Sequence, residues 1–412
     1  MRRIAWVLLL VFAFTIPWEY SLNLGEPLGN AARIAGLLLL LVAIPAVLQA
    51  GRLRAPGPMQ WVVLAFYLWF CCSYFWTVDP LATLDKLRGY PQELMIVWLV
   101  WEFAENPRNL RSLLRAYVAG SWVLVALTLA SFSSPDAITA GQIRFVAEGQ
   151  DPNDMARYLD LGFPLAALLL NCEPRWPGRL LALVYLPLGL VAVFLTASRG
   201  GFIAAVVALA GCAILLGRSH PRGVLAGAFA LPAIAAALWF WAPQGTFERL
   251  ATIPGQLQGG NLNDRTNIWI PGWHAFSKAP LIGSGAGAFA SAAGLAPINT
   301  AHNTPLSLLV SGGLCALCLF AAIVALAVWS VRRIHGPLQL ALATSLTVWL
   351  VTTLDATVEE NRTTWLLLAT IAVAGRLADE DREPLCGRFS TPAPAIGDAS
   401  QSCGGVAHDV TL

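Results

Sequence analysis

The sequence predicts an all-α protein that crosses a membrane about twelve times, and three observations predict it. Of the residues, 57% are hydrophobic and only 12% are charged, whereas charged residues make up about a quarter of a soluble globular domain. Apolar segments of roughly 20 residues, the length that spans a bilayer, recur along the chain. Arginines gather in alternate connections, as they do in multi-pass proteins. The composition therefore excludes a soluble globular protein.

The predicted spans are recognised by their apolar content. The first segment follows two arginines and resembles a signal peptide. Because no small-x-small cleavage site follows it, we interpret it as the first transmembrane helix, which is not cleaved from the chain. The predicted spans begin near Ile4, Arg33, Met59, Glu93, Leu114, Asp154, Leu180, Gly201, Gly223, Pro305, Pro337 and Thr363.

The placement of arginine orients these spans. With the N-terminus in the cytoplasm, the positive-inside rule expects the Lys and Arg excess in alternate short loops. Each short loop on that side does hold a pair of arginines: Arg52 and Arg54, Arg108 and Arg111, Arg175 and Arg179, Arg218 and Arg222, Arg332 and Arg333. We therefore expect both termini in the cytoplasm.

The chain is expected to divide into a membrane domain and a tail. The membrane domain is residues 1–377, and its one long outer loop, 243–303, lies between the ninth and tenth spans and carries short amphipathic helices. Beyond it, residues 378–412 are rich in Pro, Ser, Gly and Ala without periodicity. Such a composition predicts a disordered cytoplasmic tail.

Several cations lie on the outer side, against the positive-inside rule, and are candidates for anion binding. Arg199 is the sharpest case, because FLTASRGGFIAA places it at a very short outer turn where Gly200 and Gly201 allow close approach. A charge at a membrane boundary is a functional hypothesis by default, with snorkelling as the alternative. The other outer cations are Arg33, Lys86, Arg88, Arg144, Arg157, Arg249, Arg265, Lys278 and Arg362.

Two further arginines are candidates for an anionic substrate. Arg265, in NLNDRTNIW, precedes an amphipathic stretch, Ile268–Phe276, that is suited to a membrane surface. Pairing with the neighbouring Asp264 is the alternative interpretation. Arg144, in the outer loop AGQIRFVAEGQDPNDMARYL, is a weaker candidate.

His302 is the candidate general base. In TAHNTPLSLLVSGG, Asn303 or Thr304 is placed to cap a helix whose first turn holds Pro305. The positive end of that helix disfavours the imidazolium and leaves a neutral ring that can accept a proton. A structural histidine is the alternative.

The glycine-rich stretch APLIGSGAGAFASAAG predicts a tight turn. No strand precedes it, and the spacing of Gly283, Gly285 and Gly287 is not that of a dinucleotide fingerprint. The sequence shows no pattern of zinc ligands either, so we expect neither a metal nor a cofactor.

Several motifs occur together in one order. SRGG at an outer turn, DR followed by IWIPGWHAFSKAPLIGSGAGAF, and HNTPLSLLVSGG opening the next span resemble the O-antigen ligase and polymerase superfamily of bacterial envelope glycosyltransferases. The segments Asp151–Leu159 (DPNDMARYL) and Trp76–Tyr90 (WTVDPLATLDKLRGY) resemble earlier motifs of that superfamily. The resemblance extends from about Phe75 to Gly313.

The resemblance implies an inner-membrane enzyme that transfers a glycan from undecaprenyl diphosphate to a periplasmic acceptor, with inversion and without a metal. By this resemblance Arg199 and Arg265 bind the diphosphate, and His302 takes the proton of the acceptor hydroxyl. Asp355, Glu359 and Glu360 are possible carboxylate partners of His302, among which the spacing does not select. Second-tier candidates, for the diphosphate or the shape of the pocket, are Lys86, Arg88, Arg144 and Asn153.

Loop lengths favour a ligase that joins O-antigen to lipid A-core in lipopolysaccharide biosynthesis. Polymerases tend to have two substantial periplasmic loops, whereas Ser133–Asn153 is modest and only Gln244–His302 is long. Arg249 and Gly260 nevertheless match the R-x10-G spacing of polymerase loops. An O-antigen polymerase, a protein O-oligosaccharyltransferase and, from another class, a solute transporter are the alternatives. The expected partners are undecaprenyl-diphosphate-linked O-antigen, lipid A-core and membrane lipids, with no nucleic acid.

Overall fold

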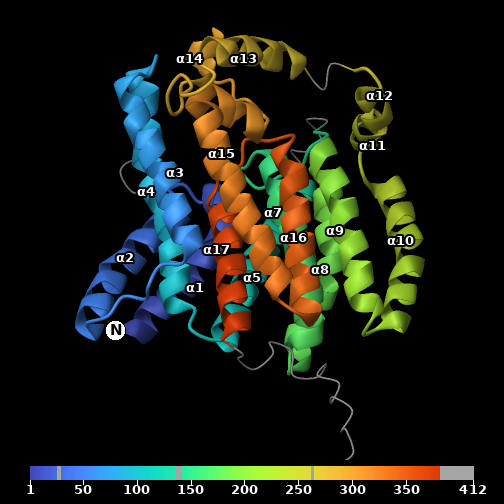
Figure 1. Cartoon of the computed structure of the whole chain (residues 1–412). Helices are drawn as coiled ribbons and strands as arrows, with labels where there is room; N and C mark the ends of the chain where they lie inside the picture. Colours follow the sequence, from blue (N-terminus) through green and yellow to red (C-terminus); the bar gives the residue numbers. More distant parts are fainter. Residues whose placement is uncertain (26–28, 135–141, 261–263, 381–412) are drawn as a thin grey trace, which may run out of the picture.

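The long helices of the molecule stand side by side in one bundle (Figure 1). The structure, a computed structural model, describes residues 1–25, 29–134, 142–260 and 264–380. The long helices are α1 (Arg2–Thr15), α2 (Ala31–Ala50), α3 (Pro58–Cys72), α4 (Pro80–Phe103), α5 (Pro107–Phe132), α7 (Pro152–Cys172), α8 (Trp176–Leu195), α9 (Arg199–Gly217), α10 (Pro221–Trp241), α15 (Thr304–Arg333), α16 (Gly336–Thr353) and α17 (Arg362–Asp379).

Short helices connect or cover them. Two 3₁₀ segments, η1 (Ile16–Ser21) and η2 (Ser73–Phe75), follow α1 and α3. The expected long loop, 243–303, contains α11 (Gln244–Ala251), α12 (Ile253–Leu257), α13 (Thr266–Lys278) and α14 (Phe289–Ala293). These four lie at the end of the bundle opposite the N-terminus (Figure 1), which we call the loop end.

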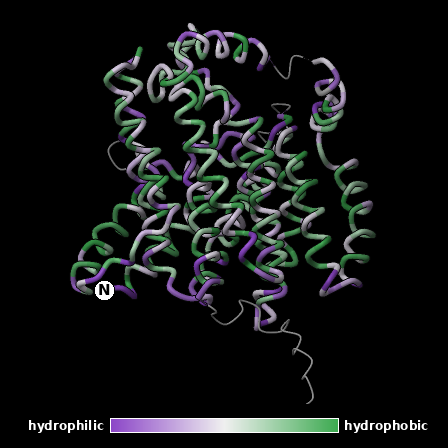
Figure 2. Tube along the Cα trace, in the orientation of Figure 1, coloured by the Kyte–Doolittle hydropathy of each residue, from purple (hydrophilic) through white to green (hydrophobic). Residues whose placement is uncertain are grey.

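Within the residues that the structure describes, eight helices are long and apolar enough to cross a membrane: α1 with η1, α2, α3 with η2, α5, α8, α9, α10 and α15. Hydrophobic residues dominate the length of the bundle, and hydrophilic residues gather toward its ends (Figure 2). The all-α polytopic membrane fold is thereby confirmed. The full count of twelve spans stays a prediction, as does the division of the chain at residue 377. The predicted tail lies outside the described residues from residue 381 onward.

Helix α7 is the most enclosed helix at the centre of the bundle. It packs against α5, α8, α9 and α16, and 17 of its 21 residues are buried. Among the buried residues are Arg157 and Asp160, although ionisable side chains are costly within a bilayer. The neighbouring helices therefore shield these polar groups from lipid.

Helix α4 begins earlier than the apolar pattern predicts. We expected a span from Glu93, whereas the helix starts at Pro80, with the Asp79 carboxylate accepting from the Ala82 amide over 3.1 Å. Proline is favoured in a first helical turn because its missing N–H would have no partner there. The charged residues Lys86 and Arg88 thus lie on a helical extension rather than in a loop.

Helix α15 is broken at Gly313, where φ is 68° and ψ is −166°. The segment 280–285 fills the break with its own backbone. The amides of Ser284 and Gly285 donate to the carbonyls of Val310 (2.8 Å) and Ser311 (2.9 Å). The amides of Leu314 and Cys315 donate to the carbonyls of Pro280 (2.9 Å) and Leu281 (3.3 Å).

This arrangement leaves the break in α15 with satisfied backbone groups, as the interior of a membrane requires. A Cβ on Gly283 would come 2.5 Å from the amide nitrogens of Gly312 and Gly313, so only glycine fits there. The glycine-rich stretch is therefore the tight turn that the sequence predicts. It docks the second half of the long loop onto the helix that follows His302.

Candidate active site

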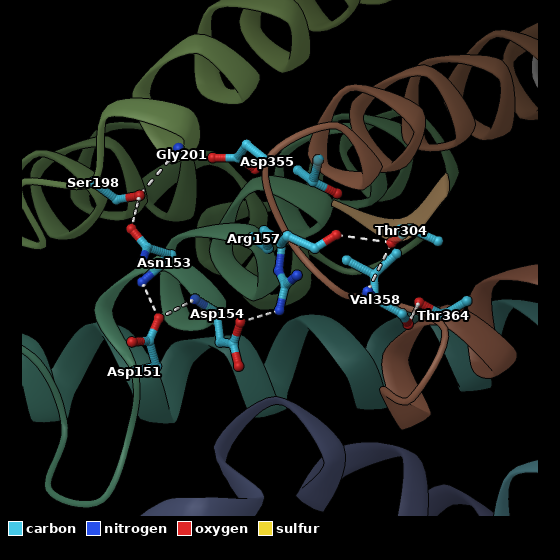
Figure 3. A network of polar contacts seen from close by, with 12 residues as sticks. Asp151, Asn153, Asp154, Arg157, Ser198, Gly201, Thr304, Asp355, Val358 and Thr364 are labelled. Carbon is cyan, nitrogen blue, oxygen red and sulfur yellow. Dashed lines mark hydrogen bonds and ion pairs between the residues drawn. The ribbon is translucent and has the colours of Figure 1, made fainter. Parts of the chain in front are cut away.

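The turn between α8 and α9 carries Arg199 and is held by hydrogen bonds from α7. Ser198 caps α9 by accepting from the Gly201 amide over 3.2 Å, and its hydroxyl donates to Oδ1 of Asn153 over 2.9 Å. Figure 3 shows this chain of contacts reaching from Asn153 to α9. Asn153, a second-tier candidate, therefore holds the turn between α8 and α9 through Ser198.

Asp355 lies against the first turn of α9, next to Arg199. A Cβ placed on Gly200 would come 1.5 Å from Oδ2 of Asp355, so the carboxylate occupies the space that any other residue would fill. Figure 3 shows Asp355 beside the start of α9. The SRGG motif suggested that another group approaches the backbone at Gly200 closely. In the structure, that group is the Asp355 carboxylate.

The residues after His302 tie its helix to the loop that carries Asp355. Asn303 caps α15 by accepting from the Leu306 amide over 2.9 Å, and its side-chain amide donates to the Leu354 carbonyl over 3.0 Å. Thr304 donates to the Ala356 carbonyl over 2.8 Å. These bonds fasten both neighbours of Asp355, so His302 and Asp355 are held in one place by the HNT sequence.

His302 is half-buried in the loop before α15, with a positive φ of 45°. Burial lowers its pKa below the ordinary value, and the nearby Arg265 guanidinium lowers it further. The carboxylates of Asp151, Asp154 and Asp355 oppose this shift. A ring that stays neutral at neutral pH can accept a proton, which is what a general base requires.

Arg265 pairs with Asp355, with 3.8 Å between Nη1 and Oδ2. Burial raises the pKa of Asp355, while the charges of Arg265, Arg157 and His302 lower it. Arg265, Asp355 and His302 therefore act on one another electrostatically. Of the three carboxylates considered as partners of His302, Asp355 is the one that this geometry favours.

The other two carboxylates point to a different neighbourhood. Glu360 forms an ion pair with Lys86 of α4. Glu359 is buried, and burial together with the charge of Glu360 raises its pKa to about 7. Lys86 thus holds the loop of Asp355 from the side of α4 instead of joining Arg199 and Arg265.

Arg88 is not brought to the site. It pairs with Asp85 on its own helix over 3.0 Å, and both side chains are 78% exposed. No ion pair or hydrogen bond found in the described segments joins Arg88 to His302, Arg199 or Arg265.

Arg144 supports the Arg199 turn from the earlier outer loop. Its Nε donates to the Thr196 carbonyl over 3.0 Å and its Nη2 donates to Oδ1 of Asn153 over 3.2 Å. Burial lowers the pKa of Arg144 to about 10, and the like charges of Arg249 and Arg199 add to this shift. Three guanidiniums therefore share this corner of the loop end.

Arg249 is the residue that sequence reasoning left out of the site. Its Nε donates to the carbonyl of Ala197, two residues before Arg199, over 3.1 Å. The signal was the same as for Arg199, a cation on the outer side against the positive-inside rule. The sequence also singled out Arg249 by its R-x10-G spacing with Gly260, but only the folding of α11 onto the turn places it beside Arg199.

The motif DPNDMARYL forms the start of α7 and supplies further charged residues near the site. Asp151 caps α7 by accepting from the amides of Asn153 (2.8 Å) and Asp154 (3.2 Å). Asp154 forms an ion pair with the buried Arg157 (Figure 3). The carboxylates of Asp151 and Asp154 both act electrostatically on His302, and Asp154 is paired with Arg157.

Strained backbone marks the same region. Among the described residues, the non-glycine positions with positive φ are Ala197 (48°), Asp264 (62°) and His302 (45°). Each is, or lies within two residues of, one of the three leading site residues. Strain of this kind persists where the surrounding structure enforces it, and it concentrates at functional sites.

The site as a whole presents cations, a neutral imidazole and a carboxylate at one end of the bundle. Guanidiniums suit phosphate oxygens because of their planar fork of donors. An imidazole beside a carboxylate suits proton abstraction. Within the described residues, no group of three or more His, Cys, Asp or Glu side chains is arranged to hold a metal ion.

Comparison with known proteins bears on the segment that contains the leading site residues. Residues 183–321 match the family model described as O-antigen ligase. This segment includes the Arg199 turn, Arg265 and His302, whereas Asp355 lies beyond it. A search of curated proteins finds no match to the chain. Through residues 183–321, the chain is similar to the O-antigen ligase family.

Proposed function

We propose that the protein is an O-antigen ligase that transfers O-antigen polysaccharide from undecaprenyl diphosphate to lipid A-core. The loop end then faces the periplasm across the bacterial inner membrane, and both termini lie in the cytoplasm. The observation that carries the proposal is the meeting of Arg199, Arg265, His302 and Asp355 at one end of the bundle. The family match supports a ligase or polymerase type of activity for the segment that supplies three of the four.

The proposed reaction is a single displacement at the anomeric carbon of the donor glycan. His302 accepts the proton of the acceptor hydroxyl while the oxygen attacks that carbon, and the bond to the diphosphate breaks on the opposite face. The configuration inverts, and the bonding electron pair leaves with the diphosphate. Asp355 stabilises the imidazolium that forms at His302.

Arg199 and Arg265 serve the leaving group in this proposal. A departing diphosphate gains negative charge in the transition state, and prearranged guanidiniums stabilise that charge where water is scarce. Arg265 is already placed by its contact with Asp355 over 3.8 Å. Arg199 is placed by donating from Nη1 to Oγ1 of Thr252 over 3.0 Å. Both arginines therefore need little reorganisation when the donor binds.

The position of the site favours transfer over solute transport. A transporter of this size binds its substrate near the middle of the membrane, between structural repeats. Here Arg265 and His302 belong to the long loop 243–303, and Arg199 donates to Thr252 of the same loop over 3.0 Å. The loop end is also where a lipid-linked glycan and a lipid-linked acceptor both present their sugars.

The proposal is tested by glycan transfer in vitro with purified protein, undecaprenyl-diphosphate-linked O-antigen and lipid A-core, in the presence of EDTA. Wild type is expected to form ligated product, and His302→Ala and Arg265→Ala are expected to lose it. Matched controls are His274→Ala and Lys278→Ala, which remove an exposed histidine and an exposed cation from α13.

Each other outcome identifies an alternative. Elongation of the donor's own glycan without ligation would make the protein a polymerase. Transfer to a protein acceptor in its place would make it a protein O-oligosaccharyltransferase. If the purified protein transfers no glycan to any of these acceptors, the glycosyltransferase proposal is wrong and the transporter alternative takes its place.

A further inference from the structure

Three arginines from three separate elements converge on four consecutive residues, 196–199. Arg144, from the loop before α7, donates to the Thr196 carbonyl over 3.0 Å. Arg249, from the last turn of α11, donates to the Ala197 carbonyl over 3.1 Å. Arg199 itself follows two residues later. The turn between α8 and α9 is therefore the centre of a compact positive cluster.

Within the described segments, this cluster has no ion pairs, whereas several other buried or part-buried cations of the bundle are paired with a carboxylate. Arg157 pairs with Asp154, Arg265 with Asp355, Arg362 with Glu19 and Lys86 with Glu360. In the same described segments, Arg144, Arg199 and Arg249 have no carboxylate within 4.0 Å. Asp151 is near enough to act on Arg144, but the three guanidiniums still repel one another because their charges are alike. An arrangement of this kind is suited to a ligand that carries more than one negative charge.

Arg249 is held so that its terminal nitrogens remain available. Its Nε is occupied by the Ala197 carbonyl, while neither Nη has a hydrogen-bond partner among the described residues. Helix α11 is itself fixed, because Thr246 donates to the Ile143 carbonyl over 2.8 Å and Phe247 packs on Phe194. The guanidinium is thus anchored at one edge and open at the other, which is the state of a prepared oxyanion binder.

Thr252 joins Arg249 to Arg199. The Thr252 hydroxyl donates to the Arg249 carbonyl over 2.7 Å and accepts from Nη1 of Arg199 over 3.0 Å. Arg199 and Arg249 are therefore linked through the Thr252 hydroxyl. A diphosphate offers two adjacent phosphate groups and at least two negative charges, which matches this pair.

We propose that Arg249 binds the diphosphate of the lipid-linked donor alongside Arg199. The inference rests on the proposed function and adds a third arginine to the two assigned there. Arg144 is a positioning residue in this arrangement, because its donors are directed at Thr196 and Asn153. Arg249 contributes its open edge, and the first half of the long loop thereby takes part in donor binding.

The experiment measures binding of inorganic pyrophosphate to the purified full chain by isothermal titration calorimetry, without any glycan transfer. We compare wild type with Arg249→Gln, Arg199→Gln and the control Lys278→Gln. Loss of a charge-assisted contact is expected to weaken binding about tenfold in Arg249→Gln and in Arg199→Gln. Lys278→Gln removes an equal charge from the exposed end of α13 and is expected to bind as wild type does.

A conservative variant guards against misfolding. Arg249→Lys keeps the charge, but one ammonium cannot hold the Ala197 carbonyl and also present a fork of donors. It is expected to bind pyrophosphate with an affinity between those of wild type and Arg249→Gln, with an unchanged midpoint of thermal unfolding. In transfer assays, both Arg249 variants are expected to raise the KM for the donor more than they lower kcat.

The results separate this inference from the proposed function. If Arg199→Gln weakens pyrophosphate binding while Arg249→Gln and Arg249→Lys bind as tightly as wild type, Arg249 is not part of the diphosphate site and the proposed function stands. If wild type itself does not bind pyrophosphate, the diphosphate site assigned to Arg199 and Arg249 is overturned, and the transfer assay alone decides the proposed function.

Discussion

The hydroxyl of Thr304 donates to the carbonyl of Ala356 over 2.8 Å and bridges the helix after His302 to the loop after Asp355. The same oxygen accepts from the Val358 amide over 2.9 Å (Figure 3). The Thr304 side chain thus ties the helix that follows the proposed base, His302, to the loop that carries Asp355. Because Thr304 is fully buried, neither contact is replaced by water when the hydroxyl is removed.

Substitution of Thr304 tests this bridge. Thr304→Val keeps the shape but leaves a buried carbonyl and a buried amide without partners, so we expect a loss of about 1–3 kcal/mol in stability. Glycan transfer is expected to fall as Asp355 moves away from His302. Thr304→Ser retains the hydroxyl and is expected to retain most activity. Equal activity of Val and Ser variants in the transfer assay would contradict the role given to the hydroxyl.

The pH dependence of transfer tests His302 as the base. Its pKa is lowered by burial and by Arg265, so a base that must be neutral is active at neutral pH and loses activity only as pH falls through the lowered pKa. Asp355→Asn removes a charge that raises this pKa, so the acidic limb of kcat/KM is expected to move to lower pH. Arg265→Gln removes a charge that lowers it, so the limb is expected to move to higher pH.

The opposite signs make this comparison decisive. A merely structural defect lowers the plateau of the pH profile without moving its limb in two directions. Identical limbs in wild type, Asp355→Asn and Arg265→Gln would therefore remove His302 from the role of base. The residual activity of each variant is compared at its own plateau, so that binding defects do not mimic a shift.

Gly200 tests the packing of Asp355 against α9. A Cβ at this position would lie 1.5 Å from Oδ2 of Asp355, so Gly200→Ala must displace the carboxylate or the turn. Displacements of about 1 Å can cost a hundredfold in rate, and we expect a loss of about that size in transfer. Gly217→Ala, at the other end of α9 with nothing within 4 Å of the added Cβ, is the control. Equal activities of the two variants would show that Asp355 does not need this position.

Gly313 tests the break in α15. Its φ of 68° disfavours any other residue, and an added Cβ would lie 2.3 Å from the Leu281 carbonyl oxygen. Gly313→Ala is therefore expected to lower the midpoint of thermal unfolding, by a loss of more than about 1 kcal/mol in stability. Gly227→Ala in α10 meets nothing within 4 Å and is expected to leave the midpoint unchanged. A stable Gly313→Ala variant would mean that α15 tolerates a continuous helix.

Local signals in the sequence account for much of the fold. Most predicted span starts lie within a few residues of a helix start, because proline and capping residues act locally. The cap formed by Asn303 belongs to this class. The start of α4 at Pro80 was not predicted, because its first turns extend beyond the apolar segment and carry charged residues. A hydropathy pattern identifies the apolar residues that a bilayer covers. It does not detect the polar turns by which a helix continues beyond the bilayer.

The candidate site needed tertiary structure for its remaining parts. Three carboxylates, Asp355, Glu359 and Glu360, were equivalent by spacing. In the structure, Asn303 and Thr304 bond to the residues on either side of Asp355, and this favours Asp355 over the other two. Arg249 gains its position because α11 folds back onto Ala197. Contacts between segments far apart in the sequence leave no pattern that a single sequence can reveal.

The break in α15 also has a consequence for the stability of the helix. Until segment 280–285 docks, the amides of Leu314 and Cys315 and the carbonyls of Val310 and Ser311 lack the partners that they have in the final structure. Unpaired backbone groups are strongly unfavourable in a bilayer. The two halves of α15 and segment 280–285 therefore complete one another's backbone hydrogen bonds, so we expect a change that loosens the segment to destabilise the helix as well.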